Sequence, residues 1–299
     1  LESIMIPTNT SSILPPPCRE GRGGSLSPVA MFVYNRADNT QKTIQHLLAN
    51  TLAREAELYV FSDGGKDEAS WAKVNALRQY LHSVKAEVET TGALKSMTIV
   101  ERKENLYLEK NITQGIMEVF LHHDHIIVLE DDICTSPYFL QYMSDAFQLY
   151  KDVPEVMHIS GFTNLCPTLP ESPLTPEGGS HSDKESLQRC PQGTPPSEVG
   201  GLDFYFTPHM SGWGWGTWRD RWLKHFKHYK SRAEALEGMT PQDMDAMQYG
   251  GVFPCLKSLD KDPIPWDICW EIAIYKAHGL CLTPRHTLVR NIGLKNGTH

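Results

Sequence analysis

The 299-residue sequence contains no run of about 18 or more apolar residues, the length that a membrane-spanning helix needs. It contains no tract rich in lysine or arginine, and its formal net charge is −8. Nucleic acid is therefore not expected as its main partner, because phosphate backbones are bound by clustered basic side chains. Its seven cysteines include no CxxC pair, so neither a zinc site nor a dense disulfide framework is indicated. We expect a soluble globular protein with no membrane span in this chain.

Composition divides the chain into an arm, a domain and an insert. Residues 1–28 are rich in Pro, Ser and Gly, which predicts a flexible N-terminal arm. Residues 29–299 are expected to form a single domain. Within that domain, residues 167–201 are crowded with Pro, Ser, Gly and Thr and lack apolar periodicity, so we expect a disordered insert or long loop there.

Strand-like and helix-like segments alternate from residue 29 onward. Strands are expected at 28–35, 57–63, 96–102 and 125–129, with helices at about 38–50, 67–89, 110–122 and 136–150. The last of these helices is expected to have Ser136 as its N-cap and Pro137 at its first position. Four strand–helix units in succession predict an α/β fold with a parallel, doubly wound sheet. A helix at 266–279, ending at Gly279, and extended segments at 156–162, 204–208 and 280–293 complete the expected elements.

The stretch HIIVLEDD at 125–132 carries the first candidate site. Its aliphatic run has too little alternation to face water, so it is expected to be a central strand covered on both faces. Glu130, Asp131 and Asp132 then lie at the carboxyl end of that strand, where open α/β sheets bind ligands. Carboxylates fixed there can hold Mg²⁺ or Mn²⁺ and leave other coordination positions to water and diphosphate oxygens. The alternative is a solvated acidic turn before a helix.

Two upstream strands end in residues that open onto the same edge. Arg36 follows the first strand, and Asp63 follows the second. An aspartate there can accept the N–H of a pyrimidine base, and an arginine can pair with phosphate. Taken singly, each is more often a turn residue.

A segment of alternating glycine and tryptophan, SGWGWGTWRDRW, occupies 211–222. Glycines at alternate positions indicate a loop rather than a regular strand. Trp213, Trp215 and Trp218 could stack on a sugar ring or close over a donor, and core packing of at least one of them is the competing interpretation.

The order VYNR, FSDGG, VLEDD followed by SPYFLQYM, the Gly/Trp-rich segment, and PWD on a helix resembles the family of Golgi N-acetylglucosaminyltransferase I and its bacterial glycosyltransferase relatives. The resemblance covers roughly 29–299 without the insert, and SGWGWGTWRDRW and the LVRNIG…GTH ending are most similar to the bacterial members. It implies the GT-A nucleotide-sugar transferase fold, with a mostly parallel central sheet and helices on both faces.

The resemblance also implies roles for single residues. Arg36 and Asp63 match positions that bind uracil or the nearby phosphate. Asp132 matches the direct metal ligand, and Asp131 and Glu130 match contacts to the ribose and the donor sugar. His299, in the GTH ending, resembles a position where some transferases of this fold place a metal-ligating histidine.

Asp267 of PWD matches most closely the family's catalytic base, although WDICW stands where the animal enzyme has two adjacent acids. The register is open by one residue, and Glu271 is a second candidate on the same helix face. An inverting transfer needs one carboxylate apart from the metal acids, to take the proton of the acceptor hydroxyl. The competing interpretation of Asp267 is an acid stabilised by the helix dipole.

The expected function is metal-dependent, inverting transfer of a sugar from a UDP-sugar, with N-acetylglucosamine as one candidate, to a carbohydrate or glycoconjugate acceptor. Mn²⁺ or Mg²⁺ is the expected cofactor. The alternatives are a degenerate transferase kept as a carbohydrate-binding or scaffold protein, and a sugar-1-phosphate nucleotidyltransferase. The latter needs a glycine-rich basic loop after the first strand, where this sequence reads NRADNT. The compartment stays open: cytoplasm for a bacterial protein, Golgi lumen for a eukaryotic one with a preceding anchor.

Overall fold

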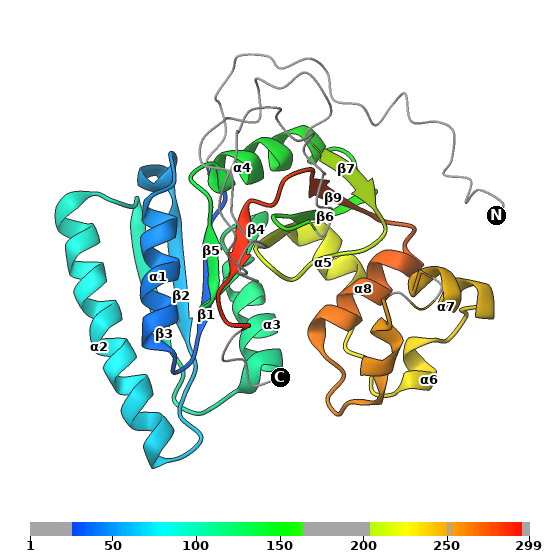
Figure 1. Ribbon diagram of the computed structural model, residues 1–299, viewed down its shortest axis with the longest axis horizontal. Helices are drawn as coiled ribbons and strands as arrows, with labels where there is room; N and C mark the ends of the chain where they lie inside the picture. The colour runs from blue at the N-terminus through cyan, green and yellow to red at the C-terminus, as the bar shows by residue number, and fades with distance from the viewer. Residues whose placement is uncertain (1–25, 164–203, 250, 252, 295–299) are drawn as a thin grey trace, which may run out of the picture.

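The computed structural model describes residues 26–163, 204–249, 251 and 253–294 (Figure 1). All but the last three residues of the arm at 1–28, the insert at 167–201 and the metal-ligand candidate His299 therefore lie outside the described residues. None of the helices within the described part is long and apolar enough to cross a membrane.

The first half of the chain alternates strands and helices as predicted. Its elements are β1 (Val29–Val33), α1 (Ala37–Leu48), the 3₁₀ helix η2 (Ala53–Glu55), β2 (Glu57–Ser62), α2 (Glu68–Thr91), β3 (Ser96–Glu101), α3 (Tyr107–Val119), β4 (His125–Glu130), β5 (Ile133–Thr135) and α4 (Phe139–Tyr150). Among these, α2 begins at a capping box, in which the Asp67 carboxylate accepts the Ser70 N–H and the Ser70 hydroxyl accepts the Asp67 N–H. It ends at Gly92, which has a left-handed backbone.

The second half adds further strands and a group of short helices. Its elements are β6 (Val156–Ser160), β7 (Phe204–Thr207), β8 (Trp215–Trp218), α5 (Arg219–His225), α6 (Arg232–Ala235), α7 (Pro241–Met247), the 3₁₀ helix η3 (Cys255–Asp260), α8 (Trp266–Lys276), β9 (Leu280–Pro284) and β10 (Val289–Asn291). In Figure 1, α6, α7 and α8 lie together on one side of the sheet, opposite α1 and α2.

The main sheet has the strand order β3-β2-β1-β4-β8-β6-β9-β7. β1 lies between β2 and β4 and is parallel to both, and β2 is parallel to β3, so the first four strands are doubly wound as predicted. β8 runs antiparallel between β4 and β6. The expected α/β class, with a mostly parallel central sheet and helices on both faces, is confirmed.

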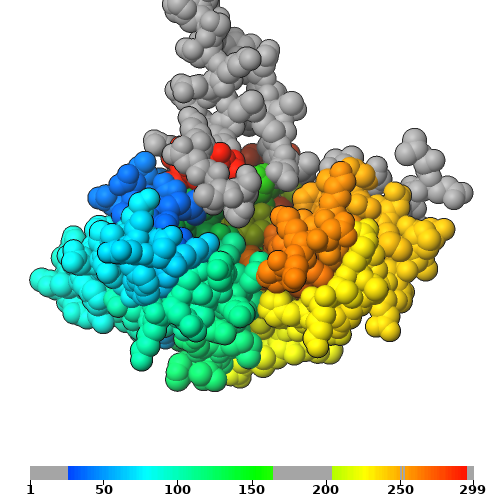
Figure 2. Space-filling view, turned by 90° about the horizontal axis from the view of Figure 1, so that it is seen from below, coloured from blue at the N-terminus to red at the C-terminus, as the bar shows by residue number. Residues whose placement is uncertain are grey.

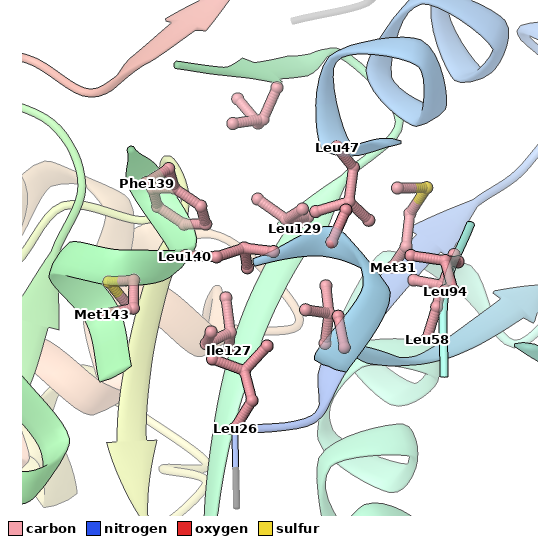
Figure 3. Close-up of a cluster of buried hydrophobic side chains, with 14 of the residues drawn as sticks. Leu26, Met31, Leu47, Leu58, Leu94, Ile127, Leu129, Phe139, Leu140 and Met143 are labelled. Atoms are coloured by element: carbon pink, nitrogen blue, oxygen red, sulfur yellow. The ribbon is translucent and has the colours of Figure 1, made fainter. Parts of the chain in front are cut away.

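Each face of the sheet has its own apolar core, because successive side chains of a strand point to opposite faces. On one face, α1, α2 and α4 pack over Met31, Leu58, Ile127 and Leu129, and Leu47, Phe139, Leu140 and Met143 fill the space between (Figure 3). On the other face, α3, α5 and α8 pack over Phe32, Ile126 and Val128 through Ile112, Ile116, Trp222 and Trp270. The prediction that the strand at 125–129 is covered on both faces is confirmed.

The prediction that the Gly/Trp-rich segment is a loop was wrong from Trp215 onward, where β8 and then α5 follow. Trp215–Trp218 is β8, a buried strand at the middle of the sheet. Close packing explains the glycine in this strand, because a Cβ on Gly216 would lie 2.6 Å from the Phe147 ring and 2.8 Å from the Ile126 carbonyl oxygen. Glycine therefore permits the close approach of α4 and β4 to this strand.

Two predicted helix ends also need correction. The helix after the acid cluster begins at Phe139 with Tyr138 before it, so Ser136 is not its N-cap and Pro137 is not its first residue. The Ser136 N–H instead donates to the Leu288 carbonyl and extends the pairing of β5 with β10. At the end of α8, the left-handed residue is His278 rather than Gly279. A Cβ on Gly279 would collide with the Met157 sulfur, so this glycine serves close packing rather than a cap.

Candidate active site

The carboxyl ends of β1, β2 and β4 meet at one edge of the sheet. In the parallel ladders, Val33 pairs with Ser62 and Phe32 pairs with Glu130. Arg36, Asp63 and the acid cluster follow these pairs directly. Figure 2 shows the surface hollowed between the first half of the chain, blue to teal, and the orange segment that includes α8.

Arg36 joins the first strand end to the acid cluster. Its guanidinium binds the Asp131 carboxylate through two nitrogens, with Nε at 3.2 Å from Oδ2, and Nη2 lies 3.0 Å from Asp132 Oδ2. Burial raises the pKa of Asp131 to about 6, and the Arg36 charge opposes that rise. A bidentate arginine held in this way can also face phosphate oxygens, because about a third of its side chain stays exposed.

Glu130 lies at the end of β4 beside these groups. Burial raises its pKa to about 8, and the negative charges of Asp132, Asp131 and Asp267 raise it further. A carboxyl with this pKa is largely protonated at neutral pH and can donate a hydrogen bond to a ligand as well as accept one. The charge of Asp267 acts on Glu130, so the first turn of α8 lies within electrostatic range of the acid cluster.

Asp132 lies under the last described segment of the chain. Its backbone oxygen accepts the Ile292 N–H at 2.9 Å, and β10 pairs antiparallel with β5 just beyond it. A Cβ on Gly293 would collide with Asp132 Oδ2 and lie 3.1 Å from Arg36 Nη1. Only glycine leaves room there for the Asp132 carboxylate and its arginine partner.

The carboxylates of this site fit a hard divalent cation whose other ligands are water molecules and oxygen atoms of a substrate. Among the described residues, no three side chains of His, Cys, Asp or Glu converge on a common metal position. Mg²⁺ and Mn²⁺ are commonly bound through one or two carboxylates together with phosphate oxygens and water. Asp132, whose side chain is 11% exposed, is placed to supply such a carboxylate.

Substitution of Gly293 tests this role of Asp132. Gly293→Ala is expected to weaken Mn²⁺ binding about tenfold, because the added methyl group displaces the carboxylate that would hold the ion. Titration followed by electron paramagnetic resonance measures the affinity. Gly212→Ala is the matched control, since a Cβ there meets only the Trp266 ring, at 3.7 Å. A folded Gly293→Ala protein with unchanged Mn²⁺ affinity would contradict the assignment.

Asp63 makes structural contacts that sequence patterns do not reveal. Its Oδ1 accepts the N–H groups of Gly64 at 2.9 Å and Leu106 at 2.8 Å. Burial raises its pKa, and these backbone hydrogen bonds oppose the rise. Asp63 therefore ties the connection between β3 and α3 to the end of β2, and a contact with a nucleotide base stays a prediction.

The two candidate bases differ in what holds them. Glu271 is 3% exposed, its Oε1 lies 2.5 Å from His209 Nδ1, and its Oε2 accepts the Met210 N–H at 2.8 Å. Asp267 lies in the first turn of α8 and is partly exposed, and its Oδ1 accepts the Ile268 N–H at 2.9 Å. Because both oxygens of Glu271 are engaged in the interior, Asp267 is the better candidate base.

The predicted donor-stacking tryptophans lie in different environments. Trp215 is fully buried, with its ring stacked between His158 and Trp266 at centroid distances of 5.2 and 5.1 Å. It therefore belongs to the core and presents no exposed face to a donor. Trp213 is partly exposed and packs edge-on against Phe162 at 4.5 Å, so its contact with a sugar stays a prediction.

Glu109 was missed by sequence reasoning. It lies in the first turn of α3, and its Oε2 accepts the Trp266 N–H of α8 at 2.5 Å. Burial raises its pKa to about 7, the Trp266 N–H opposes the rise, and the Asp267 charge adds to it. Nothing local marks Glu109 in the sequence, because an acid in a first helical turn is ordinary and its partner lies 157 positions away.

The comparisons with known proteins give distant likenesses to solved structures. No family model matches the chain, and no curated protein matches it. Among solved structures, a TarS fragment from S. aureus matches at 12% identity and a TM-score of 0.33, covering 45% of this chain and 35% of that one. The match thus spans about a third of the TarS fragment.

Two other structures match over more of the chain. A mannosyltransferase from Pyrobaculum calidifontis, in complex with GDP-Man and Mn²⁺, matches at 12% identity and a TM-score of 0.40, covering 85% of this chain and 74% of that one. GalNAc-T7 with UDP, GalNAc and Mn²⁺ matches at 12% identity and a TM-score of 0.47, covering 87% and 42%. At these identities and TM-scores, the likenesses assign no function to this chain.

Proposed function

We propose that this protein is a metal-dependent glycosyltransferase that moves a sugar from a UDP-sugar to a hydroxyl group of a carbohydrate acceptor with inversion. The observation that carries the proposal is the convergence of Arg36, Asp131 and Asp132 at the carboxyl edge of the sheet, with Asp267 close to this cluster on another element. N-acetylglucosamine is the first sugar to test, because the sequence motifs resemble the N-acetylglucosaminyltransferase I family.

The donor half of the site is built on the strand ends. Asp132 would hold Mn²⁺ or Mg²⁺, and the bound cation neutralises the negative charge of a diphosphate leaving group. Arg36 supplies a fixed positive charge beside Asp132. Asp131 orients Arg36 through its two hydrogen bonds and is too deeply buried to do much else.

The acceptor half of the site belongs to α8. Asp267 would take the proton of the attacking hydroxyl, while the sugar's anomeric carbon loses the diphosphate from its opposite face. This needs a carboxylate outside the metal site, and Asp267 is carried by α8, an element separate from β4 and β5. Glu271 is held by His209 and Met210 and would support the helix instead.

The sugar-1-phosphate nucleotidyltransferase alternative is disfavoured by the segment after β1. Residues 35–40 lead directly into α1 and contain no glycine, so they form no glycine-rich phosphate loop. No described feature favours the degenerate binding protein over the enzyme.

The proposed activity is tested by UDP release from a panel of UDP-sugars with Mn²⁺, Mg²⁺ or EDTA. We expect slow hydrolysis of one donor in the presence of metal, faster release when a suitable acceptor is added, and loss of both in EDTA. Release that persists unchanged in EDTA would contradict metal dependence. If no donor is turned over although UDP binds with metal, the degenerate binding protein becomes the better interpretation.

A further inference from the structure

The first N–H group of α8 donates its hydrogen bond to a side chain of a different helix. The residue before the helix, Pro265, makes no side-chain cap, and the first N–H groups of a helix have no partner within it. Glu109 of α3 fills this role, because its Oε2 accepts the Trp266 N–H at 2.5 Å. A carboxylate at this end of a helix is also favoured by the helix dipole.

The contact fixes the turn that carries the candidate base. Trp266 is held by its backbone through Glu109 and by its ring, which stacks on Trp215 at 5.1 Å and an interplanar angle of 16°. Asp267 follows it directly in the chain. The α3 end of the contact is anchored on the donor half, since α3 packs against β1 and β2. Glu109 therefore links the donor half of the site to the turn that carries Asp267.

We propose that Glu109 is a positioning residue: by capping α8 from α3, it holds in place the turn that carries Asp267. The role in catalysis rests on the proposed function, whereas the cap does not.

The charged neighbours of the pair are known. Glu109 faces Asp267 on α8 and Lys261 from the segment before it, and Asp267 also faces Glu130 and Glu271. The negative charge of Asp267 adds to the burial that raises the pKa of Glu109 to about 7, so both forms of the Glu109 carboxyl are present at neutral pH. Each form has an oxygen that can accept the Trp266 N–H.

Three variants separate the cap from the charge. Glu109→Gln keeps an oxygen that can accept the Trp266 N–H but removes the charge, and Glu109→Ala removes both. Glu104→Gln is the matched control, because this exposed glutamate lies just before α3. All three are made in the full chain, with thermal unfolding recorded to confirm that each folds.

The first readout is nuclear magnetic resonance and needs no turnover. In Glu109→Ala, hydrogen exchange of the Trp266 amide is expected to be about fivefold faster, whereas Glu109→Gln stays near the wild-type rate. Unchanged Trp266 exchange in Glu109→Ala would overturn the proposal.

The second readout is UDP release once a donor is known. Glu109→Ala should lower kcat at least about tenfold at unchanged donor KM, because the base is misplaced. Glu109→Gln should recover most of kcat, because its amide oxygen can still accept the Trp266 N–H. If Glu109→Gln is as inactive as Asp267→Asn, Glu109 is itself a base and the positioning role is wrong. If no donor is turned over at all, the proposed function fails, and the resonance data still decide the cap.

Discussion

Asp132→Ala is expected to slow metal-dependent UDP release about a thousandfold, the largest effect of any single substitution. A divalent cation at a leaving diphosphate contributes several kcal/mol to transition-state stabilisation, and each 1.36 kcal/mol, roughly, is tenfold in rate. Asp132 lies beside Arg36 and is the acid assigned to the cation, so its loss removes the carboxylate that would hold the ion. Initial rates of UDP release with and without Mn²⁺ measure the effect.

Two comparisons make the Asp132 result specific. Asp152→Ala, at an exposed aspartate remote from the acid cluster in the chain, should leave the rate unchanged. In Asp132→Ala, the residual rate should no longer respond to Mn²⁺ or EDTA. A variant that folds, keeps its rate and still needs metal would show that another group holds the cation.

Asp267→Asn is expected to lower kcat a hundredfold or more, with donor binding unchanged. General base catalysis contributes about 10²- to 10⁴-fold, and an asparagine side chain cannot take a proton. Donor binding is kept because Asp267 belongs to α8, whereas the donor groups lie on the ends of β1, β2 and β4. Steady-state kinetics with a saturating acceptor, together with equilibrium binding of UDP, separate the two quantities.

Glu271→Gln gives the contrast to Asp267→Asn. Glu271 is buried and bonded to His209 and the Met210 N–H, so its neutralisation should lower the unfolding temperature while kcat of the folded protein changes little. The reverse pattern, with kcat lost in Glu271→Gln and kept in Asp267→Asn, would assign the base to Glu271.

The strand ends of the first half could be predicted because the signal is local. Aliphatic runs such as Ile126–Leu129 are buried on both faces of a sheet, and chain direction then places the residues after each run at the carboxyl edge. The convergence of Arg36 with Asp131 and Asp132 could be expected from that rule alone. The motifs similar to N-acetylglucosaminyltransferase I added candidate roles for these residues, and those roles stay predictions.

The rest of the site depends on contacts between distant parts of the chain. Glu271 is held in the interior by His209 and the Met210 N–H, and no periodicity in α8 reveals these contacts. The Glu109–Trp266 contact spans 157 positions. Gly216 was taken as a loop signal because glycine is unfavourable in strands, but here close packing of Phe147 outweighs that cost.

Calorimetric titration of UDP with and without Mn²⁺ decides whether the carboxyl edge of this sheet is a metal and nucleotide site. We expect binding of UDP that requires Mn²⁺, is retained in Asp267→Asn and is lost in Asp132→Ala. UDP binding that is absent with Mn²⁺, or present equally without it and in Asp132→Ala, would contradict the assignment of such a site to this edge.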